Sequence, residues 1–174
     1  FVDLHPAAAS ESFASATSGA EQVGRALIGS VQRASLWTGT AASWVDLTPA
    51  SASASIAAGV AGGQQVGQAF IPGGGGGANH AGLWNGTAAS WVDLHPAGAS
   101  ESIARAVLAG QQVGDAVIGG ASHAGLWNGT AASWVDLHPA GASQSYCYGI
   151  SAGGQAGYAD LGGPSIFHAV VWTG

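Results

Sequence analysis

Aspartate and histidine at a short fixed spacing are the residues best suited to chemistry in this chain. The motif Trp-Val-Asp-Leu-His-Pro places Asp93 two residues before His95, and Ser100 follows shortly after. Ser, His and Asp are the residue types of a hydrolytic triad, in which imidazole takes the hydroxyl proton and carboxylate orients the imidazole. Residues two apart on a strand share a face, so the spacing predicts that Asp93 and His95 point to the same side.

The same histidines offer a second chemistry, because neutral imidazoles bind Zn²⁺. A metal ring would need His5, His95 and His138 to converge on one axis, and Thr48 stands where the fourth histidine should be. A catalytic site needs one asymmetric cluster, whereas these residues are copied from repeat to repeat. We therefore expect them to tie loops to backbone N–H groups, and we predict no catalytic residue, no metal and no cofactor.

The elements that position these residues form a tandem repeat. Asp3, Asp46, Asp93 and Asp136 occupy one position of a block that recurs after 43, 47 and 43 residues. The longer spacing reflects a glycine run at 73–77. A period of this size indicates a repeat array such as a propeller or a solenoid. We place the repeats at about 1–48, 49–95, 96–138 and 139–174, within one domain.

Each repeat reads as four short strands. Glycine recurs too often for helix, with 30 in the chain, and no stretch keeps a 3.6-residue apolar period. Turn signals such as Asn128-Gly129 separate the apolar segments. For the third repeat we predict strands at 101–109, 112–118, 123–127 and 133–137. Four strands in about 43 residues is the size of one propeller blade.

The predicted fold is therefore an all-β, four-bladed β-propeller with four antiparallel strands in each blade. The chain begins with a fourth strand, Phe1 to Leu4, and ends with a third strand, Phe167 to Trp172. Pairing Val2 to Leu4 beside Val170 to Trp172 would complete the last blade and close the ring. Closure would remove an open sheet edge that otherwise templates aggregation.

Several of the repeated sequence motifs also resemble those of a known family. They are His-Ala-Gly-Leu-Trp, which begins at His80 and at His123, then Val-Asp-Leu, and then Gln-Gln-Val-Gly. These resemble the bacterial extracellular HAF-type repeat, although Gly82 and Gly125 stand where that family has an aromatic residue, and Arg33 replaces the first histidine. The resemblance implies a secreted or cell-surface bacterial β-propeller. It carries over no catalytic residues.

Composition excludes several functions. Only 7% of residues are charged, against about a quarter in ordinary globular proteins. Nine carboxylates against three arginines and no lysine give a net charge of −6, which disfavours nucleic acid and anionic membrane surfaces as partners. No apolar run is long enough to insert into a membrane. The single Cys147 cannot form an internal disulfide. The chain starts without Met, and we expect a mature fragment or a section of a longer chain.

Aromatic residues are the candidates for binding. One Trp at a fixed position in each strand is typical of packing between blades, yet some of these rings could line a sugar-binding groove. The fourth repeat deviates most, since Tyr146-Cys147-Tyr148 replaces Ile103-Ala104-Arg105. The candidate ligand-binding residues are Trp84, Trp127, Tyr146 and Tyr148. We predict a non-enzymatic extracellular binding module for carbohydrate or another surface polymer. The alternatives are a self-assembling homo-oligomeric subunit of a surface fibre, and then a hydrolase.

Overall fold

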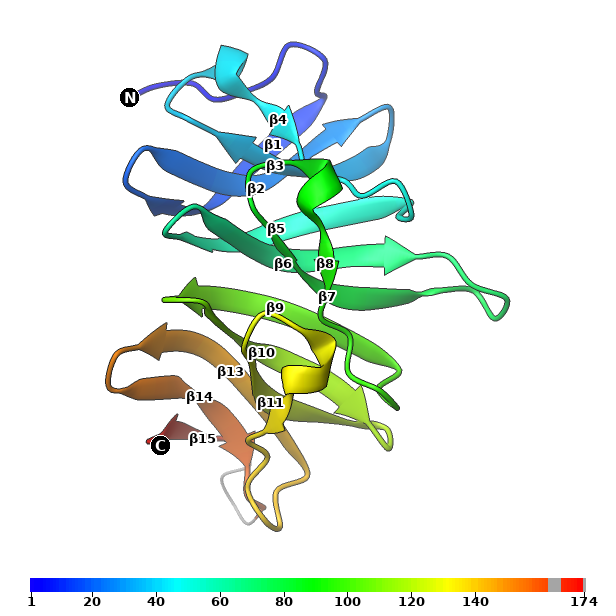
Figure 1. The fold of residues 1–174 in the computed structure, drawn as a ribbon, viewed down its shortest axis with the longest axis vertical. Helices are drawn as coiled ribbons and strands as arrows, with labels where there is room; N and C mark the ends of the chain where they lie inside the picture. The colour runs from blue at the N-terminus through cyan, green and yellow to red at the C-terminus, as the bar shows by residue number, and fades with distance from the viewer. Residues whose placement is uncertain (163–166, 174) are drawn as a thin grey trace.

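The computed structural model describes residues 1–162 and 167–173, which form four antiparallel β-sheets in chain order (Figure 1). The first sheet contains β1 (Glu11–Ser18), β2 (Glu21–Ile28), β3 (Val31–Trp37) and β4 (Val45–Asp46). The second contains β5 (Ala54–Ala61), β6 (Gln64–Ile71), β7 (Ala78–Trp84) and β8 (Val92–Asp93). The third contains β9 (Glu101–Leu108), β10 (Gln111–Ile118), β11 (Ala121–Trp127) and β12 (Val135–Asp136). The fourth contains β13 (Gln144–Ser151), β14 (Gly154–Asp160) and β15 (Phe167–Trp172).

The all-β prediction is confirmed, and each sheet follows the chain order of its strands. The predicted fourth strand is shorter than expected. A 3-10 turn precedes it in three repeats, namely η1 (Ala41–Ser43), η2 (Ala88–Ser90) and η3 (Ala131–Ser133). Among the described residues these turns are the only helical elements, and none could cross a membrane.

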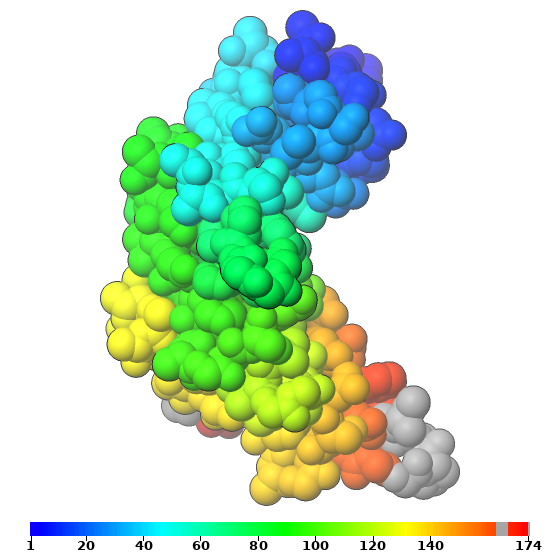
Figure 2. Space-filling view, turned by 90° about the vertical axis from the view of Figure 1, so that its right-hand side faces the viewer, coloured from blue at the N-terminus to red at the C-terminus, as the bar shows by residue number. Residues whose placement is uncertain are grey.

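The sheets stack into a crescent. The first strand of each sheet packs across the three long strands of the sheet before it, and the first strands of neighbouring sheets also touch. Figure 2 shows the 3-10 turn segments (green and yellow) on the convex side and a hollow on the opposite side. The first strands form the other edge of each sheet, so β1, β5, β9 and β13 lie toward the hollow.

The ends of the crescent do not meet. Phe1–Leu4 lies outside any strand, and the fourth sheet has three strands. The chain termini lie at opposite ends of the stack (Figure 1). The closing strand predicted from the sequence is therefore not formed among the described residues, and four sheets are shown without a closed propeller. Residues 163–166 and Gly174, which belong to the predicted last repeat, lie outside the described residues.

The core consists of three apolar clusters, one between each pair of neighbouring sheets. In the first, Trp84 of the second sheet packs against Leu36 and Leu47 of the first. In the second, Trp127 packs in the same way against Leu83 and Leu94. The third cluster is smaller and includes Val113, Ala124 and Cys147, with Leu137 and Trp172 partly buried beside them. Each sheet thus buries its apolar face only against its neighbours, as in other repeat proteins.

Candidate functional site

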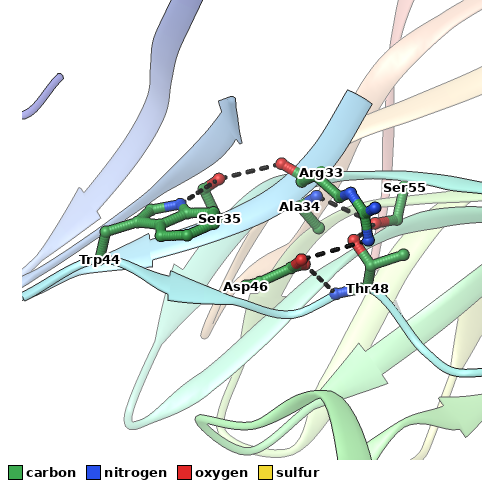
Figure 3. A network of polar contacts seen from close by, with 7 residues as sticks. All are labelled: Arg33, Ala34, Ser35, Trp44, Asp46, Thr48 and Ser55. Carbon is green, nitrogen blue, oxygen red and sulfur yellow. Dashed lines mark hydrogen bonds and ion pairs between the residues drawn. The ribbon is translucent and has the colours of Figure 1, made fainter. Parts of the chain in front are cut away.

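The repeated Asp and His residues join one repeat to the next through a set of hydrogen bonds that we call the inter-repeat latch. Figure 3 shows the first copy, in which Asp46 Oδ1 accepts from the backbone N–H of Thr48 at 2.8 Å. Thr48 Oγ1 lies 2.8 Å from Ser55 Oγ in the next sheet. Ser55 Oγ also accepts from the backbone N–H of Ala34 at 2.9 Å. The latch therefore connects the end of one sheet to the first strand of the next.

In the second latch histidine replaces threonine and makes one more bond. His95 Nε2 lies 3.0 Å from the Ala99 carbonyl oxygen, and Nδ1 lies 2.8 Å from Ser102 Oγ. Since a carbonyl only accepts, Nε2 carries the proton, and Nδ1 accepts from the Ser102 hydroxyl. Ser102 Oγ in turn accepts from the backbone N–H of Ala81 at 2.9 Å. The third latch repeats this geometry with His138, Ala142, Ser145 and Ala124.

This arrangement does not form a hydrolytic triad. Asp93 bonds the backbone N–H of His95 and the Nδ1 atom of His80, so it does not orient the His95 ring. The serine that meets His95 is Ser102, which is 1% exposed and cannot reach a substrate. Ser100, the serine considered in the sequence, instead donates weakly to the Val117 carbonyl at 3.5 Å.

Electrostatics agree with a structural role for the latch histidines. Burial lowers the pKa of His95, and the neighbouring His80 lowers it further. The two rings stack with centroids 3.9 Å apart. A neutral imidazole with its proton on Nε2 satisfies both hydrogen bonds of His95, with Nδ1 accepting from Ser102.

The three histidines considered as a metal ring do not come together. His95 and His138 belong to the second and third latches, and His5 lies before the first sheet. Each has both ring nitrogens within hydrogen-bond distance of a serine and a carbonyl. Within residues 1–162 and 167–173 no group of three His, Cys, Asp or Glu side chains could hold a metal ion.

The tryptophans proposed as ligand platforms are core residues. Trp84 and Trp127 are both 0% exposed, so neither offers a ring face to a ligand. Each instead lies in the apolar cluster between its own sheet and the preceding one. The structure therefore places these two residues where they cannot contact a ligand, and Tyr146 and Tyr148 remain of the four candidate ligand-binding residues.

Three equivalent positions on the first two strands vary between the repeats. Two of the positions form a cross-strand pair, and the third is an extra residue that bulges from the first strand. We call these three residues the variable triplet of each sheet. The four triplets are Phe13, Ser15 and Arg25; Ile56, Ala58 and Gln68; Ile103, Arg105 and Asp115; and Tyr146, Tyr148 and Tyr158.

The triplets of the third and fourth sheets meet, and we call the residues Arg105, Asp115, Tyr146, Tyr148 and Tyr158 the Arg–Tyr site. Arg105 Nε donates to Asp115 Oδ1 at 2.6 Å, and the Arg105 guanidinium lies 4.6 Å from the centre of the Tyr148 ring. The Tyr148 and Tyr158 rings stack at 5.5 Å, and Tyr146 lies 5.0 Å from Tyr158. Bulges commonly redirect a side chain in this way.

The site combines a buried ion pair with accessible rings. The Asp115 side chain is 6% exposed, and burial raises its pKa although the hydrogen bond from Arg105 opposes the shift. Tyr148 is 46% exposed. The hydrogen bond with Tyr148 raises the pKa of Tyr158 above its usual value. A cavity of about 210 Å³ beside the ion pair is lined in part by Glu101, Ser122 and Tyr146.

Sequence reasoning identified Tyr146 and Tyr148 but missed Arg105, Asp115 and Tyr158. A position-by-position comparison of the four repeats carries the missing signal. At the bulge position the first two repeats have the small residues Ser15 and Ala58, whereas the last two have Arg105 and Tyr148.

The remaining nucleophile in the fourth sheet is inert. Cys147 is 0% exposed and burial raises its pKa to about 11, so its thiol stays protonated at neutral pH. The Arg–Tyr site therefore offers hydrogen bonds and ring faces, and it holds no activated nucleophile. No protein-family model, curated protein or solved structure matches this chain in the three comparisons made.

Proposed function

We propose that this chain is a non-enzymatic carbohydrate-binding module and that the Arg–Tyr site is its binding surface. The observation that carries the proposal is the contrast between the latches, which are repeated, and the variable triplets, which are not. A residue copied into every repeat holds the array together, whereas polar and aromatic residues confined to one interface can recognise a ligand. Recognition residues supported by a rigid scaffold are common in proteins.

The chemistry of the site favours a neutral sugar. The accessible ring of Tyr148 and its neighbour Tyr158 offer apolar faces on which the C–H face of a pyranose can pack, while their hydroxyls can exchange hydrogen bonds with the sugar. Arg105 is already paired with Asp115, so the site brings no unpaired positive charge for an acidic ligand. The net charge of −6 also disfavours polyanions.

Two further parts of this proposal rest on the sequence. The HAF-type resemblance supports a secreted or cell-surface location in a bacterium. Four sheets of about 43 residues support a four-bladed propeller, which would require the crescent to close through Phe1–Leu4. A closed propeller would keep the Arg–Tyr site between its third and fourth blades, so the binding proposal does not depend on closure.

The test is a glycan-array screen followed by calorimetric titration of the selected neutral oligosaccharide. Tyr148→Ala and Arg105→Ala should each lower affinity at least tenfold. Tyr148→Ala installs the residue that the second repeat carries at that position, Ala58, and the first repeat has the similarly small Ser15, so this variant should fold normally. Arg105→Ala is made together with Asp115→Gln, which installs Gln68 of the second repeat, because Arg105→Ala alone would leave the buried Asp115 carboxylate unpaired. Phe13→Ala, in the triplet of the first sheet, is the matched control and should leave affinity unchanged. Absence of binding to any neutral glycan, or equal losses in all three variants, would refute the proposal.

A further inference from the structure

The cavity beside the Arg–Tyr site is bordered by a row of side chains that crosses the third sheet. Glu101 of β9 pairs with Val117 of β10, and Val117 pairs with Ser122 of β11, so the three side chains share one face of the sheet. The cavity has a volume of about 210 Å³, and Tyr146 of β13 closes its other side. Because the Tyr146 ring also lies 5.0 Å from the Tyr158 ring, the cavity adjoins the tyrosines of the site.

The second sheet has a cavity at the equivalent place, and its volume is only about 60 Å³. The row that crosses this sheet consists of Ala54, Phe70 and Asn79. Two of its side chains are larger than their counterparts in the third sheet, since Phe70 corresponds to Val117 and Asn79 to Ser122. The third sheet thus has additional room beside the one interface that also carries the tyrosines.

The larger cavity also presents polar groups that have no partner. In the second sheet Gln68 Nε2 donates weakly to Asn79 Oδ1 at 3.5 Å, so the asparagine of that row is engaged. In the third sheet, within residues 1–162 and 167–173, the side chains of Glu101 and Ser122 make no hydrogen bond or ion pair. A carboxylate that accepts and a hydroxyl that donates therefore face the cavity unpaired.

The rest of the lining includes apolar side chains. Ile103 and Val117 both line the cavity and are only partly buried by the chain itself. The cavity thus offers an acceptor, a donor and an apolar wall. An acetamido group matches all three, because its N–H needs an acceptor, its carbonyl needs a donor and its methyl group needs apolar contact. A hydroxyl group would leave the apolar wall uncovered, and an ammonium group could not accept from Ser122.

We infer that this cavity holds the acetamido group of an N-acetylhexosamine whose ring packs on Tyr148 and Tyr158. The inference rests on the proposed function of the Arg–Tyr site and names the class of sugar that the site selects. Glu101 accepts from the amide N–H, Ser122 donates to the carbonyl, and Val117 contacts the methyl group. An N-acetylhexosamine is uncharged, which agrees with the pairing of Arg105 by Asp115. A site built to hydrogen-bond a substituent discriminates strongly against a sugar that lacks it.

The test compares two trisaccharides that differ only in this substituent. Triacetylchitotriose carries an acetamido group on each ring, and cellotriose carries a hydroxyl group there. In calorimetric titrations at neutral pH the parent chain should bind triacetylchitotriose about tenfold more tightly or better. Val117→Phe narrows the cavity and Glu101→Ala removes its acceptor. Each should weaken binding of triacetylchitotriose to the level of cellotriose and leave the affinity for cellotriose unchanged.

The second repeat supplies the controls. Val117→Phe and Glu101→Ala install its own residues, Phe70 and Ala54, and Glu101 is exposed, so a thermal melt should show folded protein for both variants. Phe70→Val widens the cavity of the second sheet, which has no tyrosine beside it, and should leave both affinities unchanged.

The outcomes separate the choice of sugar from carbohydrate binding itself. Equal affinities for the two trisaccharides, equal losses for both in the variants, or an array whose bound glycans lack N-acetylhexosamine would overturn the acetamido assignment and leave the binding proposal standing. Tighter binding of fully deacetylated chitotriose than of triacetylchitotriose would also overturn it, in favour of an ammonium group paired with Glu101. Failure of every neutral glycan to bind would overturn the proposed function and this inference with it.

Discussion

We expect the latch serine Ser102 to contribute substantially to the free energy of unfolding through a single oxygen atom. Ser102→Ala removes one oxygen that serves two partners, the backbone N–H of Ala81 at 2.9 Å and His95 Nδ1 at 2.8 Å. Ala81 is 0% exposed, so water cannot replace the lost acceptor. A buried unpaired N–H costs about 1–3 kcal/mol, and the lost bond to histidine adds about 1 kcal/mol.

We therefore expect Ser102→Ala to lower the free energy of unfolding by about 2–4 kcal/mol, measured by urea denaturation followed by circular dichroism. Ser100→Ala is the control, because its weak surface bond should be worth no more than about 0.5 kcal/mol. His95→Thr should be milder than Ser102→Ala, since Thr48 fills the same place in the first latch at 2.8 Å from its serine. Equal and small losses for Ser102→Ala and Ser100→Ala would refute the latch.

Three other predictions follow from packing and protonation. Because burial lowers the pKa of His95 below its ordinary 6.5, the unfolded chain binds more protons, so stability should fall as the pH drops through about 6.5; His95→Thr should flatten that part of a pH series of urea melts. With its pKa raised from 9.0 to about 11, native Cys147 should react with iodoacetamide at pH 8 about a hundredfold more slowly than a free thiol of pKa 9.0, and equal rates in native and urea-unfolded protein would contradict this. Gly82→Val should destabilise the chain by about 1–3 kcal/mol through a clash with the Trp91 ring, which lies against Gly82, and adding Trp91→Phe should restore part of that loss in a thermal melt, whereas additive losses would argue against this clash.

The repeat and its strands could be predicted from the sequence because both depend on local patterns of residues. The predicted strand at 112–118 corresponds to β10 at Gln111–Ile118, and the one at 123–127 to β11 at Ala121–Trp127. The segment 133–137 was misjudged at its start. Ser133 Oγ accepts from the Asn128 N–H and donates to the Thr130 carbonyl, and these bonds hold a 3-10 turn where a strand was expected.

Only part of the Arg–Tyr site could be predicted from the sequence. Tyr146 and Tyr148 stand out in the sequence because they break the repeat, but the position of Arg105 beside them depends on a bulge in β9 and on how the third and fourth sheets stack. Neither feature has a local sequence signal. Trp84 and Trp127 illustrate the same limit. A tryptophan ring can either bind a sugar at the surface or pack in the core, and the packing between sheets, which the sequence does not reveal, places both residues in the core. Whether the ring of sheets closes depends on the curvature of the whole stack, which also has no local sequence signal.

Binding at the Arg–Tyr site can be followed directly by nuclear magnetic resonance of the tyrosine and phenylalanine ring carbons during titration with the selected neutral oligosaccharide. We expect saturable shifts at Tyr148 and Tyr158, with none at Phe13 in the equivalent triplet of the first sheet. Shifts centred on Phe13, or no shift at Tyr148 and Tyr158 at saturating ligand, would contradict the assignment of the Arg–Tyr site as the binding surface.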